Sequence, residues 1–312
     1  MSSLIEQAAL RLEQLRQAGV VMPEDGYLQP RGVGAREDLS PLQPPLVAEP
    51  AKLAEPVHPL SSRVVLDLEA LEAQGFLTPN AARSTLADQY RVVKRPLIQN
   101  AMGRGAATLN HANLIMVTSA LAGEGKSFTA LNLALSIAAE QDNTVMLVDA
   151  DVARPSVLRM LGLPNGPGLL DVLENSVDMA SVMLRTNVDK LTLLPSGTPH
   201  ARATELLASD AMCTLLENMA KRYPDRIIIF DSPPLLLTTE ARVLASHMGQ
   251  IVVVVHAERT AQSAVLQALA TIEACPLKML LLNQASGSAS GSYGYGYGYG
   301  YGYGSGSETA KS

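Results

Sequence analysis

The stretch that decides the fold is "TSALAGEGKSFTALNLAL", residues 118–135. The apolar, β-branched run "LIMVT" at 114–118 predicts a buried strand, and the apolar spacing after the glycines predicts a helix over 126–140. A glycine-rich turn between a strand and a helix lets backbone N–H groups close around phosphates, and the helix N-terminus adds its positive end. The sequence therefore predicts a phosphate-binding loop, or P-loop, rather than a glycine-rich turn with an incidental lysine.

Two side chains of this loop carry the chemistry. Lys126 can reach the β- and γ-phosphate oxygens of a nucleotide, and Ser127 can offer its hydroxyl to Mg²⁺. Ala120 stands where the pattern G-x-x-x-x-G-K-[ST] has its first glycine, so the motif is incomplete, but the strand before it and the helix after it support it. We expect the nucleotide to lie against Ala122, Gly123, Glu124, Gly125, Lys126, Ser127 and Phe128.

Three acidic residues follow predicted strands. "VMLVDADVARP" contains Asp149 and Asp151, and "IIIFDSPP" contains Asp231. Because ligands of parallel α/β sheets bind outside the carboxyl ends of the strands, we expect these carboxylates beside the P-loop. An aspartate there can hold Mg²⁺ directly or through water, so Ser127, Asp149 and Asp231 are the predicted metal ligands. A turn or helix cap is the common alternative for a single aspartate, and it stays most open for Asp151.

The pattern of the P-loop strand and helix repeats along the chain. Apolar runs recur at 144–148, 190–194, 226–230, 251–255 and 278–282, and helical stretches at 203–222, 237–247 and 260–273 lie between most of them. Runs that are apolar throughout indicate strands buried on both faces of a parallel sheet. Aromatic residues make up only 4% and there is no Trp, so the core must be aliphatic. We therefore predict a doubly wound, mostly parallel α/β sheet of the P-loop ATPase type.

The segments before the P-loop have their own patterns. Residues 3–18 have the spacing and capping box of an amphipathic helix, which docks either on its own domain or on a partner. Eight prolines over 23–59 indicate an extended linker. A helix ended by a glycine is expected within 64–79, and a stronger one over 80–101, which Pro96 should kink or interrupt.

The chain is predicted to have four parts: an N-terminal amphipathic helix (1–20), a Pro-rich linker (21–63), a catalytic domain that includes the helix at 80–101 (64–285) and a tail (286–312). The tail contains "SYGYGYGYGYGYG", with six of the chain's nine tyrosines. Gly, Ser and Tyr alone cannot build a core, so the tail should be disordered. By composition alone, a sticky low-complexity segment is its simplest interpretation.

Charge and cysteine content exclude some classes. A net charge of −6 gives no argument for nucleic acid or anionic lipid as a partner. Cys213 and Cys275 form neither a metal-ligand pattern nor a disulfide framework, which favours a reducing cytosol. No apolar run approaches the roughly 20 residues of a membrane span, and the N-terminus does not have the pattern of a signal peptide. We expect a cytoplasmic protein that reaches a membrane only through a partner.

The quoted motifs resemble those of one family. "SALAGEGKS", "VMLVDADVARP" and "IIIFDSPP" look like the Walker A, Walker A′ and Walker B motifs of the bacterial protein-tyrosine kinases, and the similarity covers about 86–304, tail included. The segments "DQYRVVKRPLIQNA" and "SLIEQAALRLEQLRQAG" further resemble the autokinases associated with exosortase-type exopolysaccharide loci. The resemblance implies a P-loop ATPase fold, ATP as the phosphate donor and Mg²⁺ as the cofactor.

The resemblance also implies roles for individual residues. Lys126 and Ser127 would bind phosphates and Mg²⁺, and Asp231 would be the Walker B acid. Asp149 and Asp151 would be the Walker A′ acids, one of which helps to deprotonate the incoming phenol. The phosphate acceptors would be Tyr293, Tyr295, Tyr297, Tyr299, Tyr301 and Tyr303.

Two further motifs match the family with substitutions. Asp88, Arg91 and Lys94 align with a motif E-x-x-R-x-x-R, which implies subunit contacts in a homo-oligomer such as a ring. The replacements keep the charges but weaken bidentate pairing. Ala153 stands where Walker A′ usually has an arginine, and the neighbouring Arg154 is the candidate substitute.

The resemblance finally implies a setting. The protein would regulate exopolysaccharide biosynthesis and export through autophosphorylation. A separate membrane protein, a polysaccharide co-polymerase that determines chain length, would activate it and recruit it from the cytoplasm to the inner membrane. The N-terminal helix and linker are the expected docking parts.

Two other classes of protein stay open. A switch ATPase of the partitioning or division-site type would carry a second lysine in the pattern K-G-G-x-G-K-[ST], but Leu121 occupies that position and cannot reach a phosphate across a dimer. It would also carry a terminal basic amphipathic helix. A scaffold with a degenerate nucleotide site is disfavoured by the intact lysine, serine and aspartates. Asn283, after the last strand, is either an adenine contact or simply a turn former.

Overall fold

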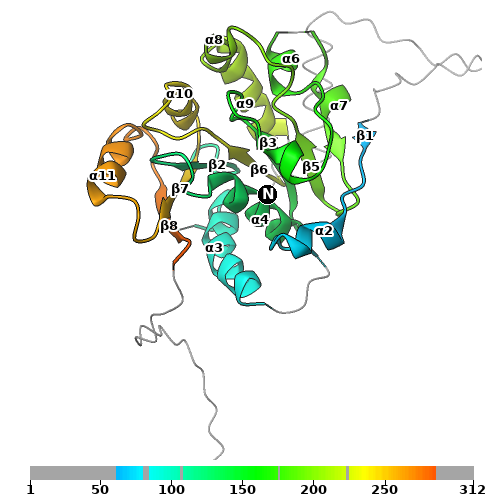
Figure 1. Ribbon diagram of the computed structural model, residues 1–312. Coiled ribbons are helices and arrows are strands. Elements are labelled where there is room, and N and C mark those ends of the chain that lie inside the picture. Colours follow the sequence, from blue (N-terminus) through cyan, green and yellow to red (C-terminus); the bar gives the residue numbers. More distant parts are fainter. Residues whose placement is uncertain (1–60, 80–83, 106–107, 175, 223–224, 286–312) are drawn as a thin grey trace, which may run out of the picture. The chain divides into compact units, whose positions relative to one another are not determined.

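The computed structural model describes residues 61–285, apart from 80–83, 106–107, 175 and 223–224. The predictions for the N-terminal helix, for nearly all of the linker and for the tyrosine tail lie outside the described residues. Within the described part, a single sheet runs through the middle of the molecule, with helices on both of its faces (Figure 1).

The sheet is mostly parallel. Its strands are β1 (Ser62–Arg63), β2 (Leu114–Ser119), β3 (Thr144–Asp149), β4 (Leu184–Arg185), β5 (Leu191–Leu194), β6 (Arg226–Asp231), β7 (Gln250–His256) and β8 (Lys278–Asn283). Their order in the described sheet is β1-β4-β5-β3-β6-β2-β7-β8, and only the β4–β5 pair is antiparallel. The predicted doubly wound, mostly parallel α/β fold is confirmed. The order also makes β3, β6 and β2 neighbours, so their carboxyl ends meet at one edge.

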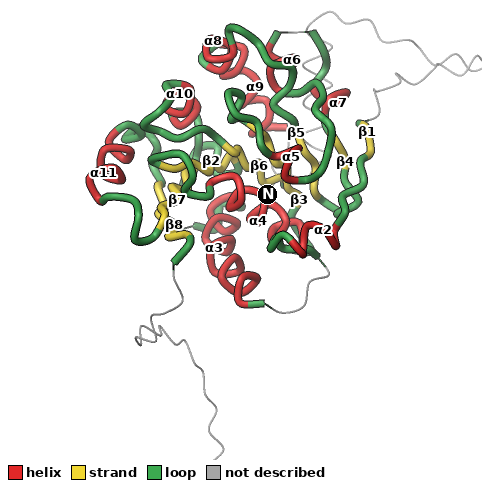
Figure 2. The backbone as a smooth tube through the Cα atoms, viewed as in Figure 1, coloured by secondary structure: helices red, strands yellow, loops and turns green. Residues whose placement is uncertain are grey.

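Helices lie in all the connections between described strands except the one between β4 and β5 (Figure 2). They are α2 (Leu68–Ala73), α3 (Thr85–Ala101), α4 (Lys126–Ala138), α5 (Val157–Met160), α6 (Leu169–Leu173), α7 (Met179–Val182), α8 (Ala203–Leu207), α9 (Asp210–Arg222), α10 (Glu240–Ala245) and α11 (Gln262–Ala270). Side chains of α2, α3 and α4 pack into the core on one face of the sheet, and those of α6 and α8–α11 pack into the core on the other.

The strand β2 shows how the two cores arise from one sequence. Leu114 and Met116 pack into one core, Ile115 and Val117 into the other, and all four side chains are fully buried. Successive residues of a strand point to opposite faces, so a strand that is buried on both sides must be apolar at every position. The aliphatic, two-sided core predicted from the continuous runs is therefore confirmed.

A glycine ends α2, as the sequence predicted. Gly75 has a φ of 84°, a left-handed conformation that glycine adopts without strain. Its N–H donates to the carbonyl of Glu72, and the N–H of Phe76 donates to the carbonyl of Leu71, both at 2.9 Å. These two bonds are a Schellman motif, which satisfies the free carbonyls at the end of α2.

The structure corrects two expectations about where helices are interrupted. Pro96 does not interrupt α3, which continues to Ala101. Proline removes one backbone N–H, and Pro96 and Val92, whose carbonyl lost that donor, are both exposed, so water can replace the bond. The expected single helix over 203–222 is two helices, because Ser209 interrupts it and accepts a hydrogen bond from the N–H of Met212 as a cap.

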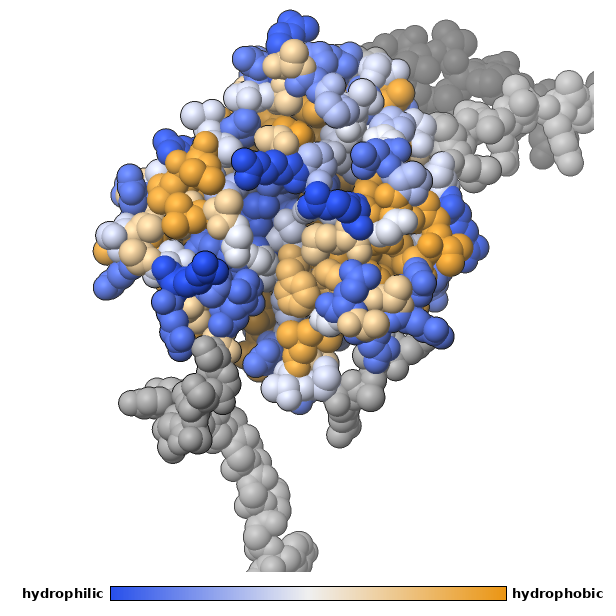
Figure 3. All heavy atoms as spheres, in the orientation of Figure 1, coloured by the Kyte–Doolittle hydropathy of each residue, from blue (hydrophilic) through white to orange (hydrophobic). Residues whose placement is uncertain are grey.

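The sheet also has edge elements that the sequence analysis did not predict. Ser62 and Arg63 of β1 pair with β4, so the sheet begins inside the segment assigned to the linker. Both strands have only two residues, and α5, α6 and α7 have four or five, which is too short to produce a periodic pattern. None of the described helices is both long enough and apolar enough to cross a membrane. Figure 3 shows apolar side chains gathered in separate areas of one face, with hydrophilic side chains between them.

Candidate functional site

The P-loop connects the end of β2 to the start of α4. Gly123 and Gly125 have φ values of 84° and 90°, in the left-handed region that favours glycine. Gly125 is the residue before the first turn of α4, so the free N–H groups of that turn face the loop. Ala120 is fully buried and is not among the described residues with positive φ. An alanine therefore fits at the position of the missing first glycine without strain.

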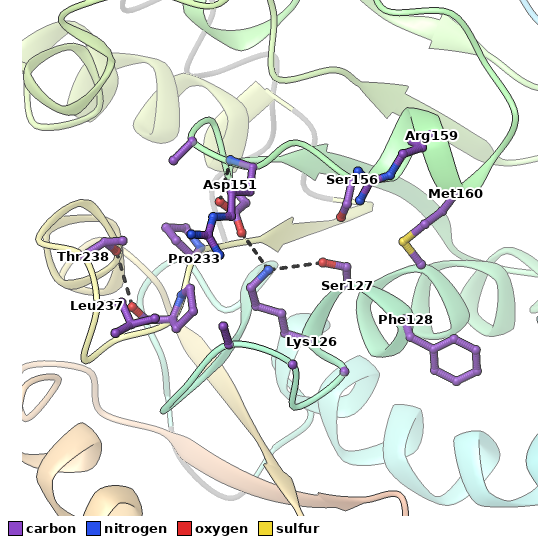
Figure 4. Close-up of a pocket in the computed structure, with 16 residues that line it drawn as sticks. Lys126, Ser127, Phe128, Asp151, Ser156, Arg159, Met160, Pro233, Leu237 and Thr238 are labelled. Carbon is purple, nitrogen blue, oxygen red and sulfur yellow. Dashed lines mark hydrogen bonds and ion pairs between the residues drawn. The ribbon is translucent and has the colours of Figure 1, made fainter.

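A cavity of about 540 Å³ opens above this loop. Its lining includes six of the seven residues predicted to contact the nucleotide: Ala122, Gly123, Gly125, Lys126, Ser127 and Phe128. Figure 4 shows that Asp151, Pro233, Leu237 and Thr238 face the same space from the other side. The volume is within the range of roughly 300–1,000 Å³ that small-molecule sites have. The seventh predicted residue, Glu124, is buried and does not line the cavity.

Lys126 stands between a carboxylate and a hydroxyl at the cavity floor (Figure 4). Its Nζ lies 2.7 Å from Oδ2 of Asp151 and 3.3 Å from Oγ of Ser127. The two charged side chains are 14% and 5% exposed. The structure therefore brings together the predicted phosphate-binding lysine, one Walker A′ acid and the predicted magnesium ligand Ser127.

Asp231 lies at the end of β6, directly opposite Asp149 at the end of β3. Both of its carboxylate oxygens are buried, and neither makes a hydrogen bond of good geometry among the described residues, although the Ser127 hydroxyl is near enough to lower the carboxyl pKa slightly. Burial raises the pKa of Asp231 from 3.8 to about 7, although the nearby charge of Lys126 opposes this rise. A buried carboxylate without well-formed hydrogen bonds is costly, so this position calls for a cation.

Asp149 is partly satisfied by the backbone of the following turn. Its Oδ2 accepts hydrogen bonds from the N–H groups of Ser156 and Val157, both at 3.0 Å, whereas its buried Oδ1 has no described partner. Burial raises the pKa of Asp149 to about 6, against the effect of these two N–H groups. The interpretation of a strand-terminal aspartate as a helix cap is therefore correct for Oδ2 of Asp149, whereas Oδ1 could still bind a metal ion.

The donor set fits a magnesium ion that is shared with phosphates. No described group of three or more His, Cys, Asp and Glu side chains is arranged to hold a metal by itself. The hydroxyl of Ser127 and the oxygens of Asp149 and Asp231 that lack hydrogen bonds of good geometry are hard ligands of the kind Mg²⁺ prefers. Mg²⁺ is usually bound by one or two carboxylates together with substrate phosphates, and the hydroxyl of Ser127 with the oxygens of Asp149 and Asp231 would suit such a site.

Two arginines add positive charge to the cavity. Arg154 and Arg159 line it and are exposed, as is the neighbouring Ala153. Arg154 thus lines the cavity, and its role as a substitute for the missing Walker A′ arginine stays a prediction. The sequence analysis did not identify Arg159, because only the short helix α5 turns it toward the cavity (Figure 4). A signal was present in the sequence, since Arg159 lies only four residues after the segment "VMLVDADVARP".

The three residues expected at a subunit interface are in different environments. Asp88 and Arg91 pair with each other on the exposed surface of α3. Lys94 is buried, and its Nζ donates to the carbonyl of Ser136 at 2.5 Å and lies 2.7 Å from Oε1 of Glu140. Lys94 thus joins α3 to α4 within one chain and differs from the expectation of an intersubunit contact. For Asp88 and Arg91, that role stays a prediction.

The side chain of Asn283 is already in use. Its Nδ2 donates to the backbone carbonyl of Glu124 at 2.9 Å, so the amide braces the P-loop. This contact gives no support to the expectation of adenine binding. The six predicted acceptor tyrosines lie outside the described residues.

Comparisons with known proteins agree with this geometry. Residues 110–282 match the protein-family model described as "ParA: NUBPL iron-transfer P-loop NTPase". The chain is similar to the tyrosine-protein kinase YwqD of Bacillus subtilis, with 32% identity over 64% of this chain and 80% of that protein. It is also similar to the tyrosine-protein kinase CpsD of Streptococcus agalactiae, with 35% identity over 56% of this chain and 76% of that protein.

Other similarities have different coverage. The tyrosine-protein kinase wzc of Salmonella typhi is 30% identical over 46% of this chain, which spans only 19% of that longer protein. Among solved structures, the kinase domain of the Escherichia coli tyrosine kinase ETK has a TM-score of 0.57 at 23% identity, and the match covers 74% of this chain and 98% of that one. The VpsO kinase domain has a TM-score of 0.52 at 25% identity, over 65% of this chain and 100% of that one. The structural matches agree with the fold class, and the sequence matches agree with the predicted resemblance.

Proposed function

The chain belongs to the ParA-type P-loop NTPases and to the bacterial protein-tyrosine kinases, and from this premise we propose that it is an ATP- and Mg²⁺-dependent tyrosine autokinase that phosphorylates its own tail. One observation carries the proposal. Lys126 and Ser127 at the start of α4 line a cavity of nucleotide size together with Asp151, and the charge of Lys126 acts on the carboxylates that end β3 and β6. That combination serves phosphoryl transfer, in which catalysis is mostly positioning and charge stabilisation.

The P-loop and the cations would bind the phosphates. The N–H groups around Gly123 and Gly125 and the first turn of α4 would hold the β- and γ-phosphates, with Lys126 as the charged partner. Arg154 and Arg159 would add charge at the rim of the cavity. Ser127, Asp231 and the free oxygen of Asp149 would hold Mg²⁺ directly or through water. Bound there, Mg²⁺ would neutralise part of the phosphate charge.

Asp151 is the better of the two Walker A′ acids for accepting the phenolic proton. It lines the main cavity, whereas Asp149 lines a small neighbouring cavity of about 50 Å³ and has two backbone N–H groups on one oxygen. Lys126 would turn from Asp151 to the phosphates, which frees the Asp151 carboxylate for a tyrosine hydroxyl. The phenolic oxygen then bonds to the γ-phosphorus, the bond from that phosphorus to the β-phosphate oxygen breaks, ADP leaves, and the proton passes to Asp151.

The tyrosine cluster supplies the acceptors. Tyr293, Tyr295, Tyr297, Tyr299, Tyr301 and Tyr303 alternate with glycine, which leaves each phenol unhindered. The tail would reach the cavity of the same chain or of a neighbour in a homo-oligomer. Each phosphate adds roughly −1.5 to −2 charges, so several would make tails repel one another and loosen that oligomer.

The setting of the reaction is inferred from the family resemblance. By resemblance, the kinase would act in the cytoplasm, regulate exopolysaccharide assembly and be recruited to the inner membrane by a co-polymerase as its activator. Deletion of residues 1–60 should abolish binding to that partner in a pull-down from membranes. Unchanged binding would show that the N-terminal segment is not the docking part.

The deciding experiment measures the intact mass of the purified full chain after incubation with Mg-ATP. We expect added phosphates that map to 293–303, and none in Lys126→Ala or in a variant with six phenylalanines in the tail. ATP hydrolysis without phosphotyrosine, even with membranes added, would favour the switch ATPase instead. Against that alternative, Leu121 stands at the position of the second lysine, and its backbone N–H is bonded to Glu124.

A further inference from the structure

Glu124 is a buried acid in the P-loop that the proposed phosphoryl transfer does not use. Its residue is only 3% exposed, and it is the one predicted loop contact that does not line the cavity. Glutamate is rarely buried this deeply unless its carboxylate has partners. The positions of those partners show what the side chain does.

The two carboxylate oxygens of Glu124 have different partners. Oε2 accepts a hydrogen bond from the backbone N–H of Leu121, within the same loop, at 2.6 Å. Oε1 accepts from the hydroxyl of Thr260 and, at 3.5 Å, from the N–H of His256. His256 ends β7 and Thr260 lies in the turn that follows. One carboxylate therefore ties the P-loop to the end of a neighbouring strand.

A second contact holds the same loop from β8. Asn283 donates from Nδ2 to the backbone carbonyl of Glu124 at 2.9 Å. A Cβ placed on Gly125 would lie 2.2 Å from that nitrogen, so the amide packs closely against the loop. Asn283 pairs with His256 across the sheet, and its carbonyl accepts from the N–H of Ala257 at 2.9 Å. Both attachments therefore come from one pair of hydrogen-bonded strand ends.

The P-loop needs such an attachment for a physical reason. A loop with glycines in left-handed conformations loses much conformational entropy when it is fixed, and a free loop would lose that entropy on binding phosphates. Donors that are already in place when the ligand arrives bind it more tightly. We propose that Glu124, Thr260 and Asn283 form a clasp that holds the P-loop in its phosphate-binding shape, with Glu124 as a positioning residue. The proposal rests on the proposed function in one respect, namely that the ligand of the loop is a nucleotide.

The test compares variants of the full chain that keep the shape of the side chains. Glu124→Gln leaves a single carbonyl acceptor where donors lie at both oxygens, and Thr260→Val removes the hydroxyl. We expect each to raise the Kd for Mg-ADP about tenfold in titration calorimetry. Thr260→Ser keeps the hydroxyl and should bind as the wild type does. The double variant should be little weaker than Glu124→Gln alone, since both changes break one contact.

A matched control separates positioning from general stability. Like the half-buried Thr260, Thr186 has a hydrogen-bonded hydroxyl, but Thr186 is buried and lies near the other edge of the sheet, between β4 and β5. Thr186→Val should lower the melting temperature and leave the Kd unchanged. In hydrogen exchange without nucleotide, amides 120–127 should exchange faster in Thr260→Val and not in Thr186→Val.

The outcomes distinguish the clasp from the proposed function. Nucleotide affinities of Glu124→Gln and Thr260→Val equal to that of the wild type would overturn the clasp, whatever the kinase assay gives. Thr260→Val alone decides the matter if Glu124→Gln does not fold. A wild-type chain that binds Mg-ADP but forms no phosphotyrosine would overturn the proposed function, and the affinities of the variants would still decide the clasp.

Discussion

A lysine–carboxylate ion pair lies at each end of helix α4, formed by Lys126 of α4 itself at one end and by Lys94 of α3 at the other. At the N-terminal end, Lys126 Nζ lies 2.7 Å from Asp151, and at the C-terminal end, Lys94 Nζ lies 2.7 Å from Glu140. The two lysine side chains are 14% and 7% exposed. By distance and burial alone, the two ion pairs are nearly equivalent.

Their surroundings are different. Lys94 also donates to the carbonyl of Ser136, and Glu140 is 43% exposed, so each charge there has a partner or reaches water. Beside Lys126, Asp231 and one oxygen of Asp149 are buried without a hydrogen bond of good geometry among the described residues. An ion pair therefore does not identify a site. What identifies it is buried negative charge in excess of its partners, which folding does not favour and a bound cation would relieve.

Removal of the Lys126 side chain should have the largest effect on activity. Lys126→Met should reduce phosphotyrosine formation by about 10²–10³-fold, because phosphate binding loses its one charged partner at the helix start. Quantitative phosphotyrosine mass spectrometry on the purified chain measures this. Activity within threefold of the wild type would mean that the two lysines are equivalent after all.

Asp231→Asn should also abolish most activity, but it should stabilise the chain. The pKa of Asp231 is raised from 3.8 to about 7, so the folded chain holds this proton more tightly than the unfolded chain does. Stability is therefore lost as the pH rises from about 4 to about 7, and the asparagine variant avoids that loss. At pH 8 the gain should be on the order of 1–4 kcal/mol, and it should vanish near pH 4. Thermal unfolding at both pH values tests this, and a lower melting temperature at pH 8 would contradict it.

Lys94→Met should behave in the opposite way to Asp231→Asn, with lower stability and unchanged activity. The variant loses the buried hydrogen bond to Ser136 of α4 and the ion pair with the partly exposed Glu140, so we expect about 1–3 kcal/mol less stability in urea unfolding. Phosphotyrosine formed per folded molecule should remain near the wild-type value at a temperature where the variant is folded. A selective loss of activity in a stable oligomer would instead support a role for Lys94 between subunits.

Activity should also depend on pH through Asp149 and Asp231, with a smaller effect than the substitutions have. Raised pKa values of about 6 for Asp149 and about 7 for Asp231 mean that acidification protonates both groups before it reaches an ordinary aspartate. Between pH 8 and pH 6, kcat/KM for ATP should fall by about tenfold, with apparent values that belong to the pair. Carboxyl ¹³C NMR, with Asp231→Asn for assignment, separates this titration from that of ATP. Carboxyl signals that titrate only below pH 5 would disprove it.

The sequence predicted the fold and the position of the acids beside the P-loop well, because both depend on local pattern. Apolar runs showed which strands are buried, and strand-terminal position was enough to bring Asp149, Asp151 and Asp231 near the P-loop. Local pattern failed where one residue decides an element. Ser209 divides one predicted helix into α8 and α9, and Pro96 remains inside α3.

By itself, therefore, the sequence determined the doubly wound sheet, the phosphate-binding loop and the acids beside it, because periodicity and glycine spacing are properties of neighbouring residues. Only the tertiary structure decided that Lys94 faces inward, that Glu124 faces away from the cavity and that Asn283 holds the loop. Those outcomes rest on partners far apart in the chain, such as Glu124 with Thr260 and with Asn283, which meet only when the sheet aligns β7 and β8 beside β2.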